Sequence, residues 1–377
     1  MLTSKNRSYV YKSGKNKQSY YILLFIVWTI FAVYRYVGQY KGIIVGGSDT
    51  PTYIEYFNTC LQTNVTSLYS YRTEILFRVF TMAIRYFTND YHVYFFIIYG
   101  FIIYCYISFI DEFDTPQINK TPLIMLFFCY LQSFCAIRTH ITIAITLLIL
   151  VCLHRKKYFY FPILAIMSFF IQKASLIFLL YPFFLFYFSK KKLTWKKAVS
   201  LVVFGCCVGV LGRRIILSGT IDGLSGVYVN YALKSTNSGY FIDYIKLIIE
   251  QVIIDILVVT LLRKHRNYKL IASENSKDES IDRIQNLTMM CYYDLMLIPV
   301  CYVMGIWRGY CYFYIPRLLM LGYMLAILYH KINSNSKKLY KLLIFCICVS
   351  WFIFRLTTIY DVSDLMPYIF DFQGWRM

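Results

Sequence analysis

The chain has 377 residues, of which 59% are hydrophobic and 20% aromatic, and its formal net charge is +20 at pH 7. That much apolar surface excludes an ordinary water-soluble domain, because a bilayer takes up about 20 apolar residues for each helical crossing. A basic balance of this size can indicate nucleic acid. Here most of the excess lies in short loops between apolar segments, which is typical of cytoplasmic loops and argues against a nucleic-acid partner.

The N-terminal segment, residues 1–19, contains five lysines and arginines and no acidic residue. We therefore predict a cytoplasmic N-terminus. The apolar run that follows has no small-residue cleavage site, so it is interpreted as a retained first helix at about 20–37. An external loop at about 38–90 comes next.

Within that loop, the stretch 74–87 is apolar but contains Glu74, Arg78 and Arg85, whose spacing places them on one helical face. It is too short and too charged for a crossing, so we predict an interfacial or re-entrant helix on the outer side. All four basic loops downstream then fall in the cytoplasm, as the positive-inside rule requires. Glu74 and Arg78 are expected to form a structural pair, with Arg78 also a candidate anion ligand.

The fold class is an all-α polytopic integral membrane protein with about 11 transmembrane helices (10–12), for which a GT-C-like arrangement is one option. One transmembrane domain at 20–358 contains an external loop at about 213–240 and a cytoplasmic loop at about 263–287. An external tail follows at 359–377. The further crossings are expected at about 91–110, 121–136, 139–153, 158–172, 174–189, 198–213, 241–262, 288–305, 310–330 and 340–358.

A polar loop precedes the interfacial helix. Its glycines allow tight turns, and Ser48 or Asp49 could cap a short helix that starts near Pro51. A carboxylate held at the outer membrane surface could also take a proton from a sugar hydroxyl. Both roles fit Asp49. The loop reads Gly46-Gly47-Ser48-Asp49-Thr50-Pro51-Thr52-Tyr53-Ile54-Glu55-Tyr56.

Six basic residues stand at predicted outer helix ends, against the bias of membrane insertion. One or two of them could extend to lipid headgroups, which we expect for the pair at 213–214. For all six, a bound anion is the better explanation, since guanidinium groups grip phosphate bidentately. The six are Arg138, Lys173, Arg213, Arg214, Arg308 and Arg317, with His140 close to the first.

Three acidic residues fall inside predicted helices: Glu250, Asp255 and Asp294. Lys246 stands four residues before Glu250, so an intrahelical pair is expected there. The two aspartates have no partner nearby in sequence. They could relay protons or pair with arginines of neighbouring helices, and the second option is favoured.

Signatures of other chemistries are missing from the sequence. It contains no P-loop, dinucleotide fingerprint, HExxH or G-x-S-x-G. No Asp-x-Asp stands in the external loops to hold a divalent cation, so we expect metal-independent chemistry without a cofactor.

Several short motifs together resemble a known family. They are Gly-Ser-Asp-Thr-Pro-Thr-Tyr at 47–53, Thr-Glu-Ile-Leu-Phe-Arg at 73–78, Ile-Arg-Thr-His-Ile-Thr-Ile-Ala at 137–144, Lys-Ala-Ser-Leu-Ile-Phe at 173–178, and the stretch from Arg308 to Arg317. The chain resembles the EpsG-type branch of bacterial polysaccharide polymerases, similar in role to Wzy O-antigen polymerases. It departs from that pattern at Gln172-Lys173, where a histidine is frequent, and at Arg138-Thr139, where Arg-Gln is frequent.

The resemblance implies a membrane glycosyltransferase that joins oligosaccharide repeat units linked to undecaprenyl pyrophosphate. It would act on the outer face of the bacterial cytoplasmic membrane, in O-antigen, capsule or exopolysaccharide synthesis. A chain-length regulator, a flippase and membrane lipid are candidate partners. The residues expected to bind pyrophosphate are Arg138, Arg308 and Arg317, with Lys173 and Arg78 as further candidates. The base that assists the acceptor hydroxyl is expected among Asp49, Glu55 and His140.

Two other classes remain open. A lipid-linked oligosaccharide flippase would also need arginines, and Asp255 and Asp294 favour it, but the sequence lacks the internal repeats of such transporters. A membrane acyltransferase that decorates the glycan would need a histidine as base, for which His140 is the candidate.

Overall fold

A computed structural model describes residues 4–40, 43–47, 49–61, 74–114, 119–188, 194–218, 229–230, 232–233, 238–261, 277–306, 308–333 and 336–358. These residues are mainly helical, with one short antiparallel hairpin of β1 (Gly38–Tyr40) and β2 (Ile43–Val45). The α-helices are α1 (Ser4–Val33), α2 (Thr50–Thr59), α3 (Ile75–Phe87), α4 (Tyr91–Phe113), α5 (Leu126–Gln132), α6 (Ile137–His154), α7 (Tyr160–Ile171), α8 (Leu176–Leu179), α9 (Tyr181–Phe188), α10 (Trp195–Leu217), α12 (Ser238–Leu261), α14 (Lys277–Met304), α15 (Tyr314–Lys331) and α16 (Lys337–Thr358).

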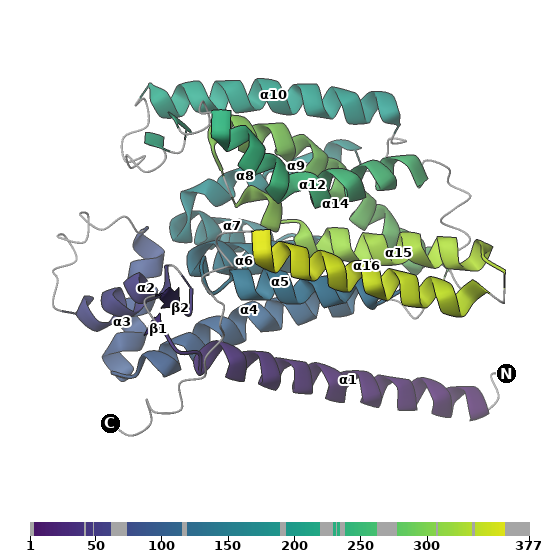
Figure 1. Cartoon of the computed structure of the whole chain (residues 1–377), viewed down its shortest axis with the longest axis horizontal. Coiled ribbons are helices and arrows are strands. Elements are labelled where there is room, and N and C mark those ends of the chain that lie inside the picture. Colours follow the sequence, from purple (N-terminus) through teal and green to yellow (C-terminus); the bar gives the residue numbers. More distant parts are fainter. Residues whose placement is uncertain are drawn as a thin grey trace.

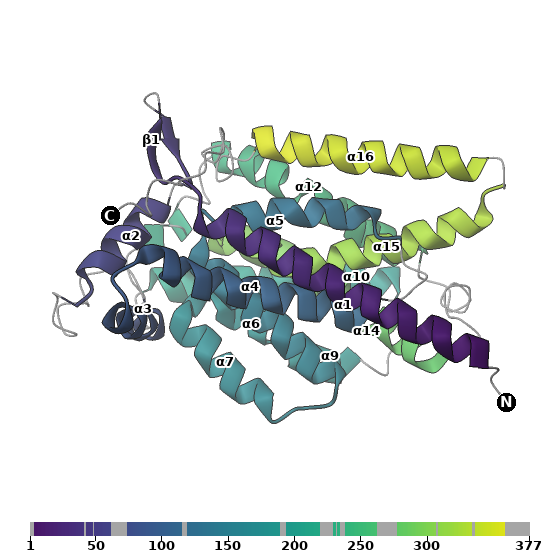
Figure 2. The same ribbon diagram turned by 90° about the horizontal axis from the view of Figure 1, so that it is seen from below.

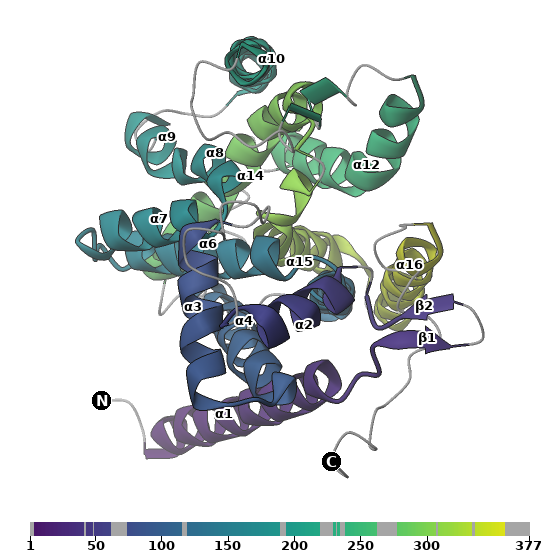
Figure 3. The ribbon, with the colours of Figure 1, turned by 90° about the vertical axis from the view of Figure 1, so that its left-hand side faces the viewer.

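The long helices run side by side along the longest axis of the molecule (Figure 1). The start of α1 lies at one end of this bundle, and α2, α3 and the hairpin lie at the other. We call the second end the α2–α3 end. Seen from below, α1 crosses over α4 (Figure 2). Seen from the α2–α3 end, α10 is viewed along its axis, whereas α3 lies lengthwise across the bundle (Figure 3).

The helices have the length and composition of a membrane protein. Among the described residues, α4, α6, α10 and the stretch Ile281–Met304 of α14 are long and apolar enough to cross a bilayer. Shorter apolar helices accompany them. The predicted helical class is confirmed and is consistent with a membrane protein, while the count of eleven crossings stays a prediction. In α6, 78% of the apolar window is buried inside the protein, against 22% in α10. Helix α6 is therefore central and α10 peripheral.

Several helix boundaries differ from the predicted ones. Helix α1 begins at Ser4, because helix propagates readily into a lysine-rich stretch once the apolar part is formed. Likewise α14 begins at Lys277, inside the predicted loop 263–287. The predicted crossing 174–189 is broken into a 3-10 turn η3 (Lys173–Ser175), α8 and α9. Pro182 stands in the first turn of α9, where a proline is tolerated but ends the helix before it. The predicted tail 359–377 lies outside the described residues.

The predicted crossing 121–136 is also divided, into a 3-10 turn η2 (Thr121–Met125) and α5. The predicted helix at 74–87 is confirmed as α3. One face of α3 is buried, through Phe77, Thr81 and Ile84. The ring of Tyr53 from α2 packs edge-on against Phe77 of α3, so the two short helices support each other at the α2–α3 end of the bundle.

Helix α10 lies directly against α14 because a row of glycines faces it. A Cβ atom added at Gly205 would stand 2.2 Å from the carbonyl oxygen of Met296, and one at Gly209 would stand 3.2 Å from the Cα of Val300. Small residues of this kind let two membrane helices approach until their backbones touch. Dispersion forces across that contact hold α10 to the bundle.

Candidate functional site

Arg35 fixes the polar loop at the α2–α3 end, just after α1. Its guanidinium donates to the carbonyl oxygen of Gly46 at 3.0 Å, to the hydroxyl of Thr50 at 3.3 Å and to that of Tyr99 at 3.0 Å. The group also lies over the rings of Phe95 and Phe134, and the side chain is 1% exposed. Sequence reasoning did not single out Arg35, although an arginine inside the predicted first helix at 20–37 was a readable signal; the helix in fact ends at Val33.

The loop itself takes a path that requires glycine. Gly46 and Gly47 have φ angles of +91° and +106°, and a Cβ on Gly47 would stand 2.7 Å from the carbonyl oxygen of Phe134. The hydroxyl of Thr50 donates to that same carbonyl oxygen at 2.5 Å. Since Phe134 lies three residues before α6, these contacts hold Asp49 near the start of the central helix.

Asp49 occupies the N-cap position of α2 but does not act as the predicted cap. Its φ and ψ of −91° and −11° are helical, and its side chain makes no capping hydrogen bond. The carboxylate instead pairs with Arg308, whose Nη2 lies 3.3 Å from Oδ2. The Asp49 side chain is 45% exposed and that of Arg308 is 27% exposed. Arg308 precedes a 3-10 turn η4 (Gly309–Cys311) between α14 and α15, so the pair links two distant parts of the chain.

A second carboxylate, that of Glu74, engages another predicted anion ligand. It forms an ion pair with Arg138, the second residue of α6. Its other oxygen accepts from the backbone N–H of Lys173 at 3.4 Å. Glu74 therefore joins α3 to α6 and to the break after α7, a role beyond the expected pair with Arg78. Arg78 itself is buried on α3.

A chain of hydrogen bonds lies behind this second pair. The amide of Gln172 donates to the hydroxyl of Thr139 at 3.2 Å and accepts from that of Thr142 at 3.1 Å. Thr142 also meets the hydroxyl of Tyr312 at 2.7 Å. These bonds attach the break after α7 to α6, and they set the position of Lys173.

The other two predicted bases are placed less favourably than Asp49. His140 is fully buried, with Nδ1 2.7 Å from the hydroxyl of Tyr106, and its Nε2 has no hydrogen-bond partner among the described residues. A substrate hydroxyl has no access to it in this conformation. Glu55 is exposed on α2, on a different face of the helix from the buried residues Tyr53 and Phe57.

Arg317, predicted to bind pyrophosphate, lies inside the bundle. It forms an ion pair with Asp294, and the two side chains are 1% and 0% exposed. Gln251 donates to the same carboxylate at 2.7 Å. The favoured expectation that Asp294 pairs with an arginine of a neighbouring helix is therefore confirmed. The structure thus separates Arg317 from Arg138 and Arg308.

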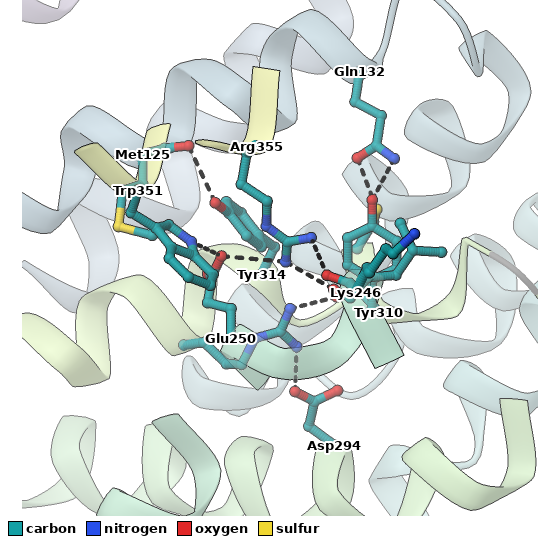
Figure 4. A network of polar contacts seen from close by, with 12 residues as sticks. Met125, Gln132, Lys246, Glu250, Asp294, Tyr310, Tyr314, Trp351 and Arg355 are labelled. Atoms are coloured by element: carbon teal, nitrogen blue, oxygen red, sulfur yellow. Dashed lines mark hydrogen bonds and ion pairs between the residues drawn. The ribbon is translucent and has the colours of Figure 1, made fainter. Parts of the chain in front are cut away.

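A second buried ion pair completes this internal network (Figure 4). Glu250 accepts from the indole of Trp351 at 2.6 Å and pairs with Arg355 at 3.4 Å. Arg355 also donates to the carbonyl oxygen of Leu247 at 2.7 Å. The expected partner of Glu250, Lys246, pairs instead with an aspartate three residues earlier. Neither Arg355 nor Trp351 was singled out, although an arginine inside an apolar segment was again a readable signal.

Two sets of polar groups bear on the predicted site. Inside the bundle lie Arg317, Asp294, Glu250 and Arg355, which are buried. At the α2–α3 end lie Asp49, Glu74, Arg138, Lys173 and Arg308, which are partly accessible. Among the described residues, no three His, Cys, Asp or Glu side chains come together as metal ligands.

A model of the EpsG family matches residues 19–370. The chain belongs to the EpsG family. No curated protein and no solved structure matches it. As an EpsG-family member with apolar helices, it is a membrane protein of polysaccharide biosynthesis.

The matched region of the EpsG-family chain includes both sets of polar residues. It also contains Cys60, at the end of α2. Burial raises the pKa of the Cys60 thiol, and the nearby Arg85 offsets only part of this shift. The thiol therefore stays protonated at neutral pH, whereas an attacking cysteine would be a thiolate.

Proposed function

We propose that this EpsG-family protein is a polysaccharide polymerase. It would join repeat units linked to undecaprenyl pyrophosphate on the outer face of the bacterial cytoplasmic membrane. The observation that carries the proposal is the gathering of Arg138 and Arg308, each with a carboxylate, at one accessible end of an apolar helix bundle. A donor with a long hydrocarbon tail and an anionic head must be met at a membrane surface, and this end offers such a place.

Charge supports the outer location. The basic segment at the start of α1 lies at the end of the bundle opposite α2 and α3 (Figure 1). The basic run from Arg155 to Lys157 follows the far end of α6, about 25 Å from Arg138 at 1.5 Å per residue. Cytoplasmic segments are enriched in Lys and Arg, so the α2–α3 end faces the outside.

In the proposed reaction, the bond between the anomeric carbon of the donor glycan and the pyrophosphate oxygen breaks. A hydroxyl oxygen of the acceptor unit forms the new glycosidic bond to that carbon. The pyrophosphate lipid leaves with the bonding electrons, and Arg138 and Arg308 stabilise its developing charge through charge-assisted hydrogen bonds. Lys173, whose backbone N–H donates to Glu74, would add a further positive charge.

The acceptor hydroxyl loses its proton to a base as the new bond forms. Asp49 is the best placed of the three candidates. Its carboxylate is partly exposed and adjoins Arg308, which puts it next to the leaving group. The same loop is held by Arg35 and Thr50, so the carboxylate starts from a fixed position.

The test uses a strain that lacks the chromosomal gene and carries plasmid variants. Arg138→Ala and Arg308→Ala should abolish long chains and leave lipid with a single repeat unit, while the protein still inserts at normal levels. The matched control is Arg155→Ala, which removes an arginine from an ion pair with Glu112 at the other end of the bundle. Normal polymer from both site variants would disprove the anion site.

A flippase is the second candidate, favoured by the buried Asp255 near Asp294. The phenotype of the deletion strain separates the candidates. Loss of a polymerase leaves surface lipid with one repeat unit, whereas loss of a flippase leaves none. Loss of a glycan-modifying acyltransferase leaves full-length chains that lack a substituent.

A further inference from the structure

Both arginines assigned to the pyrophosphate are already held by carboxylates of the same chain. Asp49 directly precedes α2 and holds Arg308, and Glu74 directly precedes α3 and holds Arg138. The two carboxylates thus come from the two short helices at the outer end of the bundle. A carboxylate presents two anionic oxygens to a guanidinium, as a phosphate group does.

We propose that Asp49 and Glu74 occupy the anion site in the resting protein and that the pyrophosphate of the donor displaces them. The inference rests on the proposed function and adds an order of binding. The donor must come first, because Asp49 is engaged by Arg308 until the pyrophosphate takes that arginine. Donor binding then releases the Asp49 carboxylate to receive the proton of the acceptor hydroxyl.

The accessibility of both pairs makes displacement feasible. The side chains of Arg138 and Arg308 are 24% and 27% exposed, and those of their partners Glu74 and Asp49 are 10% and 45% exposed, so each pair is open to the outside on one side. Partly exposed ion pairs contribute little to stability. A pyrophosphate carries more charge than one carboxylate and binds guanidinium groups bidentately, so it competes well for them.

The buried ion pairs inside the bundle provide a comparison, because no ligand can exchange with their carboxylates. Arg317 and Asp294 are 1% and 0% exposed, and the carboxylate is also held by Gln251. Nothing anionic can enter there without unfolding the bundle. The two pairs at the α2–α3 end differ from the internal pairs because they are accessible from outside, and a ligand needs this access to displace a carboxylate.

The experiment measures binding of farnesyl diphosphate to the full-length protein in nanodiscs, with farnesol as the uncharged control. Glu74→Gln and Asp49→Asn remove the competing charge with little change of shape. Each should tighten farnesyl diphosphate binding by about 2- to 5-fold, as expected for loss of a partly exposed ion pair. Arg138→Ala and Arg308→Ala should weaken it. Asp49→Asn should bind the probe more tightly and yet make no polymer.

Glu112→Gln is the matched control. It also removes the carboxylate of an arginine ion pair, with Arg155, but at the opposite end of the bundle, so binding should not change. If Glu74→Gln and Asp49→Asn instead weaken binding as the arginine variants do, the carboxylates position the arginines and the displacement is disproved. If the arginine variants bind as tightly as the wild type, the anion site of the proposed function fails as well.

Discussion

Replacement of Arg317 by alanine should destabilise the protein as a whole, because the residue is buried and ion-paired. Its partner Asp294 is 0% exposed, and removing one member of a buried pair leaves an uncompensated charge that costs about 3–5 kcal/mol. The entropy of unfolding is about 2.1 cal/mol/K per residue, or about 0.8 kcal/mol/K for a chain of this length that unfolds as a unit. Arg317→Ala should therefore lower the Tm by about 4–6 °C.

Asp294→Asn should lower the Tm less than Arg317→Ala does. Asp255 also attracts Arg317, so a carboxylate remains near the guanidinium when Asp294 is neutralised. Loss of the arginine leaves two carboxylates near each other without a cation. A larger loss of Tm in Arg317→Ala than in Asp294→Asn would therefore show that Arg317 interacts with both aspartates.

The assay is thermal denaturation of detergent-solubilised protein with a fluorescent fusion, followed by size-exclusion chromatography. Arg308→Ala is the control, since its pair with Asp49 is partly exposed and contributes about 1 kcal/mol at most. Its Tm should stay within about 1 °C of the wild type. An Arg317→Ala protein that keeps the wild-type Tm and loses long chains would refute this reasoning and make Arg317 a substrate ligand.

Two glycine substitutions make further predictions. Gly47→Ala places a Cβ 2.7 Å from the carbonyl oxygen of Phe134 at a φ of +106°. The strain should cost about 1–3 kcal/mol. The loop must shift to relieve the clash, and Asp49 shifts with it. Polymer length on gels should fall, whereas Gly239→Ala, with nothing within 4 Å, should have no effect. Gly205→Ala pushes α10 off α14 and should cost about 1–3 kcal/mol in thermal denaturation. Gly100→Ala, whose nearest contact is an ordinary 3.5 Å, should leave the Tm unchanged.

The helices were predictable because hydropathy reports on the bilayer directly. An apolar run of sufficient length has to satisfy its backbone internally, and a helix does so without any partner. The short helix α3 was predictable for a related reason, since its charges are too dense for a crossing. The breaks inside 121–136 and 174–189 have a sequence signal in Pro122 and Pro182, but a hydropathy average over a whole segment does not register a single proline.

The site was predictable in its residue types and not in its pairings. Basic residues at helix ends indicated an anion, and the structure brings Arg138, Lys173 and Arg308 to one end of the bundle. Which carboxylate meets which arginine depends on how α2 and α3 fold back over α6, and sequence spacing holds no information about that. The same limit applies to Glu250 with Arg355 and to Asp294 with Arg317, because each pair joins two different helices.

The hydrogen bonds of Gln172 affect how sequences of this kind should be compared. A hydropathy scale rates leucine at this position as an improvement, since it raises the apolar content of a segment near the membrane. In the folded protein, leucine would remove the amide that connects two threonine hydroxyls of α6 to the interrupted helix. Whether a substitution at 172 is tolerated therefore depends on the side chains of α6 that face it. Relatives that differ at 172 should show a compensating change at 139 or 142.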